Sequence, residues 1–322
     1  MKMKLLWGKL LAILLIALPA SGQVKYDEIL QGPGANWLTY HGDYQGSRHS
    51  RLKQITRDNV VKLVPKWTYH VEGATHLEAA PLVSNGVMYV TNTNEVDALD
   101  ARTGRRIWQY RDDQSSQQSP NRGVALLGDR VFFLTGDVHL VALHRNTGAV
   151  LWHKQYALAS KGYIATLAPL ALKDRVIVGV GGGDSGTRGF VAALSAATGE
   201  ELWRFWTIPA RGEPGSETWG DFPAEYAGGA TWMTGTFDPE LNLIYWPTGN
   251  PWPDMYAQGR HGDNLYTCSI VALDADDLIR PGRAVEHRDR AREPLPAEML
   301  FPELAEPDPS LAHKSAARVM NP

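Results

Sequence analysis

The fold of this 322-residue chain is decided by the sequence ALDARTGRRIW at residues 98–108. Its pattern of Ala-Leu, Thr-Gly and Trp at fixed offsets returns as ALHRNTGAVLW at 142–152 and as ALSAATGEELW at 193–203. The copies start 44 and 51 residues apart, close to the length of one blade of a β-propeller. A repeat of this length indicates copies of one supersecondary unit that bury their faces against one another.

Each copy of the repeat follows the pattern of a β-hairpin. The turn signals are Asn85-Gly86, Gly128-Asp129 and Lys173-Asp174, and each leads into a run of strand-forming apolar residues. The Thr-Gly turn then leads into a further strand, whose Trp can pack between neighbouring sheets. The chain is also rich in Trp (11), Tyr (12) and Gly (31), and helical periodicity is weak. We therefore predict an all-β fold, a β-propeller.

A fourth copy of the repeat begins and then breaks off. Residues 269–275 match the strand and its exit, but the positions that should hold Thr, Gly and Trp hold Asp277, Leu278 and Gly282. The segment 277–322 has seven prolines, many charges of both signs and no Trp or Tyr, which is poorly suited to a blade. Two interpretations stay open: a helical or interaction tail, and a frameshifted or otherwise foreign end, which the break inside a repeat favours.

The first 22 residues have the layout of a secretory signal peptide. A segment with three lysines and no acid is followed by a short apolar run at 10–18 and by small residues at 19–22. An uncleaved anchor is the alternative, although the run is short for a membrane span. No Cys lies near the cleavage site, which excludes a lipoprotein anchor. We expect a protein exported to the periplasm, with no stable membrane span after signal cleavage.

The charge and the cysteine content exclude several classes of function. The formal net charge is −3 and no basic block stands out, so nucleic acid is not an expected partner. Cys268 is the only cysteine. A disulfide framework, a Cys-rich zinc site and a C-x-x-C-H haem attachment are therefore excluded.

Four motifs lie outside the repeat: WLTYHGD at 37–43, SRHS at 47–50, QITRDNV at 54–60 and LVPKWT at 63–68. In order and spacing they resemble the quinoprotein alcohol dehydrogenase family, the methanol and ethanol dehydrogenases that use pyrroloquinoline quinone (PQQ). The likeness continues in register to about residue 276. It implies an eight-bladed propeller with the cofactor near the central axis, of which about four blades can be traced here. The resulting division is a signal peptide (1–22), a partial quinoprotein propeller (23–276) and an atypical tail (277–322).

The resemblance assigns cofactor-binding roles to residues between the repeats. Trp232 matches the Trp on which the quinone stacks, and a large rigid aromatic face suits a planar tricyclic cofactor. PQQ carries three carboxylates, and Arg122 matches the carboxylate-binding Arg of the family. The other positions implied to contact the cofactor are Glu78, Thr166, Gly181, Gly182, Gly183 and Thr231. Without the resemblance, Trp232 would be read as blade packing, Arg122 as a loop residue and the glycines as a hairpin turn.

Two further residues match the metal-binding positions of the family. Asn250 matches an amide ligand of Ca²⁺, and Asp184 falls where better-known members have Glu. Ca²⁺ prefers such carboxylate and amide oxygens. Asp is one methylene shorter than Glu, so bidentate binding is lost or requires a shifted loop. A lanthanide in place of Ca²⁺ stays open. On their own, Asn before Pro and Asp beside Gly are ordinary turn formers.

Two features of the family are missing from the sequence. Its adjacent cysteine pair would fall at Ser116 and Gln117, so the disulfide that covers the quinone in many members cannot form. Its catalytic Asp follows the fourth repeat in a motif with Trp and His, and the segment 277–322 stands there instead. Asp289 lies in that segment without a supporting motif. The catalytic base is therefore unassigned.

The resemblance implies an oxidoreductase that converts a primary alcohol to an aldehyde. A base takes the alcohol proton while hydride passes to C5 of the quinone, and Ca²⁺ acts as the Lewis acid. Electrons then leave to a cytochrome c, which must be a separate protein because the chain has no haem motif. Two alternatives stay open. One is a truncated, inactive family member, and the other is a non-catalytic propeller scaffold of outer-membrane protein assembly, which would not need Arg122, Trp232 and Asn250.

Overall fold

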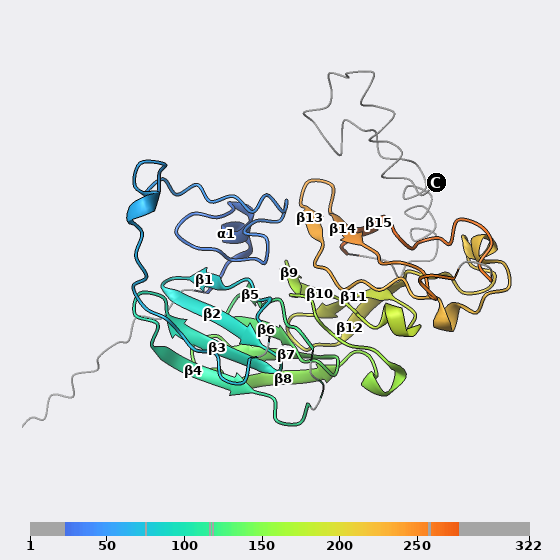
Figure 1. The fold of residues 1–322 in the computed structure, drawn as a ribbon, viewed down its shortest axis with the longest axis horizontal. Helices are drawn as coiled ribbons and strands as arrows, with labels where there is room; N and C mark the ends of the chain where they lie inside the picture. The colour runs from blue at the N-terminus through green and yellow to red at the C-terminus, as the bar shows by residue number, and fades with distance from the viewer. Residues whose placement is uncertain (1–22, 75, 116, 118, 257–258, 277–322) are drawn as a thin grey trace, which may run out of the picture.

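The computed structural model describes residues 23–74, 76–115, 117, 119–256 and 259–276. The predicted signal peptide (1–22) and the atypical tail (277–322) lie outside these residues. The described chain forms four antiparallel sheets in sequence order (Figure 1). Fifteen strands carry this part of the chain, with one short α-helix and five 3₁₀ turns. The fold is therefore all-β, as predicted, and has the arrangement of part of a propeller.

Each sheet runs through consecutive strands. Sheet one comprises β1 (Leu82–Ser84), β2 (Val87–Asn92), β3 (Glu95–Asp100) and β4 (Arg106–Arg111). Sheet two comprises β5 (Ala125–Leu127), β6 (Arg130–Leu134), β7 (His139–His144) and β8 (Val150–Gln155). Sheet three comprises β9 (Leu170–Leu172), β10 (Arg175–Gly179), β11 (Phe190–Ser195) and β12 (Glu201–Trp206). Sheet four comprises β13 (Thr236–Asp238), β14 (Leu243–Pro247) and β15 (Ile270–Asp274). The helical elements are α1 (Tyr26–Leu30), η1 (Val60–Lys62), η2 (Ala159–Lys161), η3 (Gly183–Ser185), η4 (Ser216–Trp219) and η5 (Ala224–Tyr226).

The sequence repeat occupies the third and fourth strands of the first three sheets. In sheet one, Ala98 on β3 lies opposite Trp108 on β4, and the register shifts after Ala98. The equivalent Ala and Trp face each other in sheets two and three, with the same shift. The turn between these strands explains the Thr-Gly pair of the repeat. The Thr103 hydroxyl accepts a hydrogen bond from the amide of Arg105, and Gly104 has a positive φ of 73°. The repeat therefore encodes one bulged strand pair with its turn.

The Trp residues of the first two copies dock onto the Thr-Gly turn of the next sheet. Trp108 Nε1 donates to the carbonyl of Arg145 at 2.9 Å. A Cβ at Gly148 would lie 2.6 Å from the Trp108 ring, so only glycine leaves room for this packing. Trp67, upstream of the first complete copy, packs on Gly104 in the same way. This contact explains why Thr-Gly and Trp recur together, since the Trp ring packs on the glycine of the following turn at Gly104, Gly148 and Gly199.

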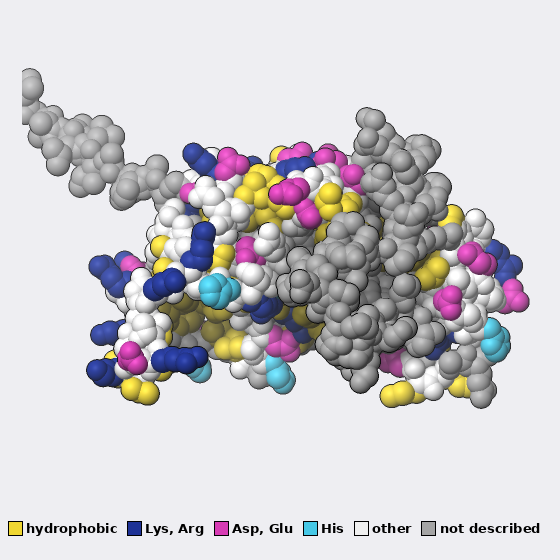
Figure 2. Space-filling model, turned by 90° about the horizontal axis from the view of Figure 1, so that it is seen from above, with side chains coloured by type: hydrophobic (Ala, Val, Ile, Leu, Met, Phe, Trp, Pro, Cys, Tyr) yellow, Lys and Arg dark blue, Asp and Glu magenta, His cyan; other side chains and the backbone are white. Residues whose placement is uncertain are grey.

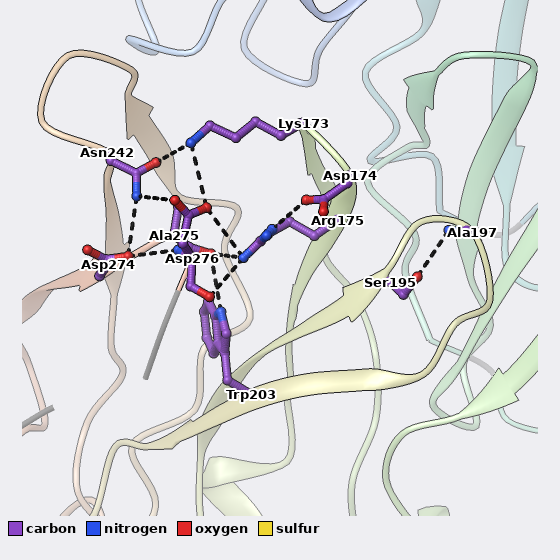
Figure 3. Close-up of polar contacts among 10 residues, drawn as sticks. All are labelled: Lys173, Asp174, Arg175, Ser195, Ala197, Trp203, Asn242, Asp274, Ala275 and Asp276. Atoms are coloured by element: carbon purple, nitrogen blue, oxygen red, sulfur yellow. Dashed lines mark hydrogen bonds and ion pairs between the residues drawn. The ribbon is translucent and has the colours of Figure 1, made fainter. Parts of the chain in front are cut away.

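Polar contacts reinforce the junction between sheets three and four (Figure 3). Arg175 Nη1 donates to the carbonyl oxygens of Ala275 and Asp276 at 2.6 and 3.1 Å. Lys173 Nζ donates to Asn242 Oδ1 at 2.6 Å, and Asn242 Nδ2 donates to Asp276 Oδ2 at 3.0 Å. These bonds hold the end of β15 against the β9–β10 turn, although the Thr-Gly turn of a fourth copy is missing from the sequence.

The N-terminal segment 24–48 ties the four sheets together, with α1 lying above β1 in Figure 1. Val24 bridges to Gly128 in the turn between β5 and β6, and Trp37 bridges to Val83 on β1. The Tyr44 hydroxyl donates to the carbonyl of Ala171 in sheet three at 2.7 Å. The Tyr44 carbonyl accepts a bond from the amide of Phe237 in sheet four at 2.9 Å. One short segment therefore fixes the sheets relative to one another.

The surface carries charged and apolar side chains together. Figure 2 shows acidic and basic side chains on one face of the molecule, with hydrophobic side chains between them. The exposed apolar residues in the segment 52–64 are Leu52, Ile55, Val60, Val61, Leu63 and Val64. Such a run differs from the single apolar side chains common on protein surfaces. In the described part of the chain, no helix has the length and apolar character that crossing a membrane requires.

Strand β3 carries two buried acidic side chains on one face, Glu95 and Asp97. Arg111 Nη2 lies 2.5 Å from Glu95 Oε2. Asp97 Oδ1 has no hydrogen bond, and Arg106 Nη1 lies 3.8 Å away. Burial and, after it, repulsion from Glu95 raise the pKa of Asp97 from 3.8 to about 6. The folded protein thus binds the Asp97 proton more tightly than the unfolded chain does.

We expect the substitution Asp97→Asn to remove a pH dependence of stability. Because the folded state holds the Asp97 proton more tightly, protonated Asp97 adds to the free energy of unfolding of the wild type below about pH 4. This stabilisation, about 3 kcal/mol at most, is lost as the pH rises to about 6. The variant should therefore gain stability over the wild type across this range. Urea unfolding at a series of pH values measures it, with the exposed Asp221→Asn as control. Equal slopes for Asp97→Asn and wild type would contradict the assignment.

Candidate cofactor and metal site

Four of the residues predicted to bind the cofactor occupy equivalent positions in the four sheets. Glu78 precedes β1, Arg122 precedes β5, Thr166 precedes β9 and Trp232 precedes β13, each by three or four residues. β5 and β9, the first strands of sheets two and three, contact each other. The segment 24–48 contacts β1, β9 and β13, the first strands of sheets one, three and four. The chain entering each sheet therefore lies on the same inner side, and the fold gathers these four residues.

Arg122 lies at the centre of this group. Its Nη2 is 2.5 Å from Glu78 Oε2, and its Nη1 donates to the carbonyl oxygen of Thr166 at 2.9 Å. Its guanidinium carbon lies 5.0 Å from the centre of the Trp232 ring, within the range of a cation–π contact. The Arg122 side chain is only 14% exposed. One partly buried positive charge thus connects residues from all four sheets.

The backbone around Arg122 is fixed on both sides. The Asn121 side chain donates to the carbonyl of Leu134 at 2.8 Å and accepts a bond from the amide of Gly123 at 2.9 Å. The amide of Ala80 donates to the Arg122 carbonyl at 3.0 Å, which places Glu78 beside Arg122. Gly123 has a φ of 132°, and a Cβ there would lie 3.0 Å from the Ala80 carbonyl oxygen. These contacts hold Arg122 in place before any ligand binds.

Trp232 presents an aromatic face, while its neighbour Thr231 is internal. The Trp232 side chain is 43% exposed, whereas Thr231 is fully buried. The Thr231 hydroxyl accepts a bond from the amide of Val180 at 2.8 Å and donates to the carbonyl of Phe190 at 2.5 Å. Both of its hydrogen-bonding roles are therefore used inside the protein, and they anchor the segment that carries Trp232. A direct contact of the Thr231 hydroxyl with the cofactor stays a prediction.

The three glycines at 181–183 form the loop after β10, and the space above them is occupied by the protein itself. Added Cβ atoms would lie 2.8 Å from Ile164 at Gly181, 2.3 Å from the Gly162 carbonyl oxygen at Gly182, and 2.8 Å from Ala230 Cβ at Gly183. Glycine is thus required for close packing within the chain. The predicted contact of these glycines with the cofactor stays a prediction.

The two predicted metal ligands lie side by side, and a third polar residue joins them. Asn250 Nδ2 donates to Asp184 Oδ1 at 3.3 Å and to Asp254 Oδ1 at 2.7 Å. Asn250 is held near Trp232 because its carbonyl accepts a bond from the amide of Gly229 at 2.9 Å. In the described part of the chain, no group of three or more His, Cys, Asp or Glu side chains is placed to hold a metal ion. A cation here would therefore depend on the amide and on further donors.

The residues at this place fit a planar ligand that carries carboxylates. The Thr166 hydroxyl is buried and has no hydrogen-bond partner in the described structure, so it can donate to a ligand. The Arg122 guanidinium can bind a carboxylate with two parallel hydrogen bonds. The exposed face of Trp232 can stack on an aromatic ring. The carboxylates of Asp184 and Asp254, together with the side-chain amide of Asn250, offer oxygen ligands of the kind that Ca²⁺ and lanthanide ions prefer.

Sequence reasoning missed two residues, one in the loop where the cysteine pair of the family would fall and one beside Asn250. Asn94 Nδ2 donates to the carbonyl oxygens of Ser115 and Gln117 at 3.2 and 3.1 Å, and so shapes the loop where the cysteine pair of the family would fall. Ser116 itself lies outside the described residues. The other missed residue is Asp254, whose only signal in the sequence is an acid four positions after Asn250, in a loop with two prolines.

Comparison with known proteins identifies the family. The sequence profile described as "Glucose/ethanol/alcohol dehydrogenase, beta-propeller domain", a PQQ family, matches residues 37–277. The chain belongs to this family. It is 38% identical over 294 residues to the quinoprotein alcohol dehydrogenase PedH of Pseudomonas putida, covering 83% of this chain and 49% of that protein. It is 34% identical to the lanthanide-dependent methanol dehydrogenase of Methylacidiphilum fumariolicum, covering 76% of this chain and 44% of that protein.

Solved structures of the PQQ family agree with the fold. The structure described as europium-containing methanol dehydrogenase has a TM-score of 0.72 and 33% identity, over 78% of this chain and 49% of that chain. The quinohemoprotein alcohol dehydrogenase of Comamonas testosteroni has a TM-score of 0.70 and 38% identity, over 75% of this chain and 39% of that chain. The chain therefore spans about half the length, or less, of the relatives it matches, consistent with a partial propeller.

Proposed function

We propose that this chain binds PQQ and serves an alcohol dehydrogenase that oxidises a primary alcohol to an aldehyde. The observation that carries the proposal is the convergence of Glu78, Thr166 and Trp232 on Arg122, from four different sheets. Membership of the PQQ family supports it. A purely structural role does not require the exposed face of Trp232 or the unpaired buried hydroxyl of Thr166.

In this proposal the residues of the chain bind and orient the cofactor. Arg122 neutralises a carboxylate of PQQ, and Glu78 fixes the orientation of the guanidinium through the ion pair. The Thr166 hydroxyl donates to a second polar group of the ligand. Trp232 supplies the stacking face, and the internal bonds of Thr231 prevent that face from moving.

The cation belongs beside this group, on Asp184 and Asn250. The amide of Asn250 exchanges its nitrogen for its oxygen by rotating half a turn, which converts the donor seen here into a ligand. Once held by these residues, PQQ would supply the hydride acceptor and a bound Ca²⁺ or lanthanide would supply the Lewis acid. We propose a periplasmic location after removal of residues 1–22, a cytochrome c as the electron acceptor, and a base supplied from outside the described residues.

We expect the 322-residue chain to bind PQQ but to show little dye-linked alcohol oxidation. Binding follows from the preformed Arg122 group, whereas turnover needs the Asp motif that residues 277–322 do not contain. Quenching of Trp fluorescence during titration with PQQ, in the presence of Ca²⁺ or La³⁺, measures binding. Reduction of a dye with ethanol measures turnover. Absence of binding contradicts the proposed function, and rapid turnover contradicts the assignment of the base to the missing motif.

A further inference from the structure

Asp184 and Asp254 place two carboxylates close to a single neutral group. Their Oδ1 atoms lie 3.3 and 2.7 Å from the same nitrogen, Asn250 Nδ2, so the two oxygens converge on one point. Among the described residues, neither carboxylate forms an ion pair with Lys, Arg or His. Two negative charges with no positive partner repel each other, and a bound cation would remove that repulsion.

The loop that carries Asp254 is held in this position. The amide of Trp252 donates to the carbonyl of Ala227 at 2.9 Å. The Trp252 ring lies over Gly186, where an added Cβ would be 3.3 Å from the ring, and so joins this loop to the loop of Asp184. Arg260, which is buried, donates to the carbonyl of Pro253 at 2.7 Å. Asp254 therefore lies beside Asp184 because the fold fixes its loop.

We propose that Asp254 is a third protein ligand of the cation, beside Asp184 and Asn250. This inference rests on the proposed function, because it concerns the metal that accompanies PQQ. The side chain of Asp184 is one methylene shorter than the Glu that the family resemblance places there. Asp254, in the loop that follows Asn250, supplies a second carboxylate. Two carboxylates make the protein part of the site strongly negative, which favours a trivalent lanthanide over Ca²⁺.

The test titrates the full chain with Tb³⁺ and measures the Tb³⁺ luminescence that a nearby Trp sensitises. Competition with Ca²⁺ then gives the affinity for Ca²⁺. We expect Asp254→Asn to weaken binding by about tenfold for Ca²⁺ and about thirtyfold for Tb³⁺, because the lost attraction scales with the charge of the ion. Asp254→Glu, which keeps the charge, should retain most of the affinity. Asp221→Asn, an exposed acid paired with Arg211, should leave both affinities unchanged.

The outcomes separate this inference from the proposed function. If Asp184→Asn weakens binding and Asp254→Asn does not, the cation site stands and the role of Asp254 is overturned. If the wild type binds Tb³⁺ no better than the double variant of Asp184 and Asp254, both the site and this inference are overturned. The Asp254 side chain is exposed, so its replacement should leave the thermal unfolding curve unchanged, and that curve serves as the folding control.

Discussion

Replacing Arg122 by alanine should weaken the binding of PQQ by about a hundredfold or more. The guanidinium can form two charge-assisted bonds with a carboxylate, and losing about 3 kcal/mol of such bonding corresponds to a factor of about one hundred. The substitution also leaves Glu78 without its partner, so that an uncompensated negative charge faces the carboxylates of the ligand. Both effects act in the same direction.

Titration of Trp fluorescence with PQQ measures this loss. Arg122→Lys keeps the positive charge but removes the planar fork, so its affinity should lie between those of wild type and Arg122→Ala. Arg211→Ala removes an exposed Arg that pairs with Asp221 and serves as the control. If both Arg122 variants bind PQQ as tightly as the wild type does, Arg122 is not the carboxylate-binding residue and the proposed function loses its main support.

The sequence predicted the repeated strand pair and its turn, because the residues that form them are neighbours in the chain. The spacing from Ala98 to Trp108 is set by one strand, one tight turn and the start of the next strand, so it can be read from a single segment. The prediction that Trp packs between sheets is confirmed by the contact of Trp108 with Gly148. The tie between four sheets through residues 24–48 could not be predicted in this way, since it depends on contacts between distant segments and leaves no periodic pattern.

In the candidate site, too, the sequence identified residues but not the contacts that depend on neighbouring sheets. The resemblance named Glu78, Arg122 and Thr166 as separate positions, but the ion pair and the bond to the Thr166 carbonyl appear only in the folded chain. Thr231 is the opposite case, because nothing in the sequence shows that its hydroxyl is used up by Val180 and Phe190. An isolated polar residue has many possible partners, and only the packing of neighbouring sheets decides among them.

Replacing Trp203 by alanine should destabilise the chain by about 3–5 kcal/mol, the usual cost of removing a buried Trp. Trp203 is 2% exposed and donates through Nε1 to the carbonyl of Ala275 at 3.2 Å (Figure 3). Its ring and its N–H therefore both bind sheet three to sheet four. The midpoint of urea unfolding, followed by circular dichroism, measures the effect. A variant with unchanged midpoint would show that this junction does not limit stability.

A pair of phenylalanine variants separates the hydrogen bond from the packing. Trp203→Phe keeps most of the ring but loses the donor, which leaves the Ala275 carbonyl with one bond fewer and should cost about 1 kcal/mol for the bond. Trp152 is the equivalent residue of sheet two, and its buried Nε1 has no hydrogen-bond partner in the described structure. Trp152→Phe removes an unsatisfied polar group and should cost less than Trp203→Phe. Equal losses in the two variants would contradict a contribution of the Trp203 bond to Ala275, which is the contact that Trp152 lacks.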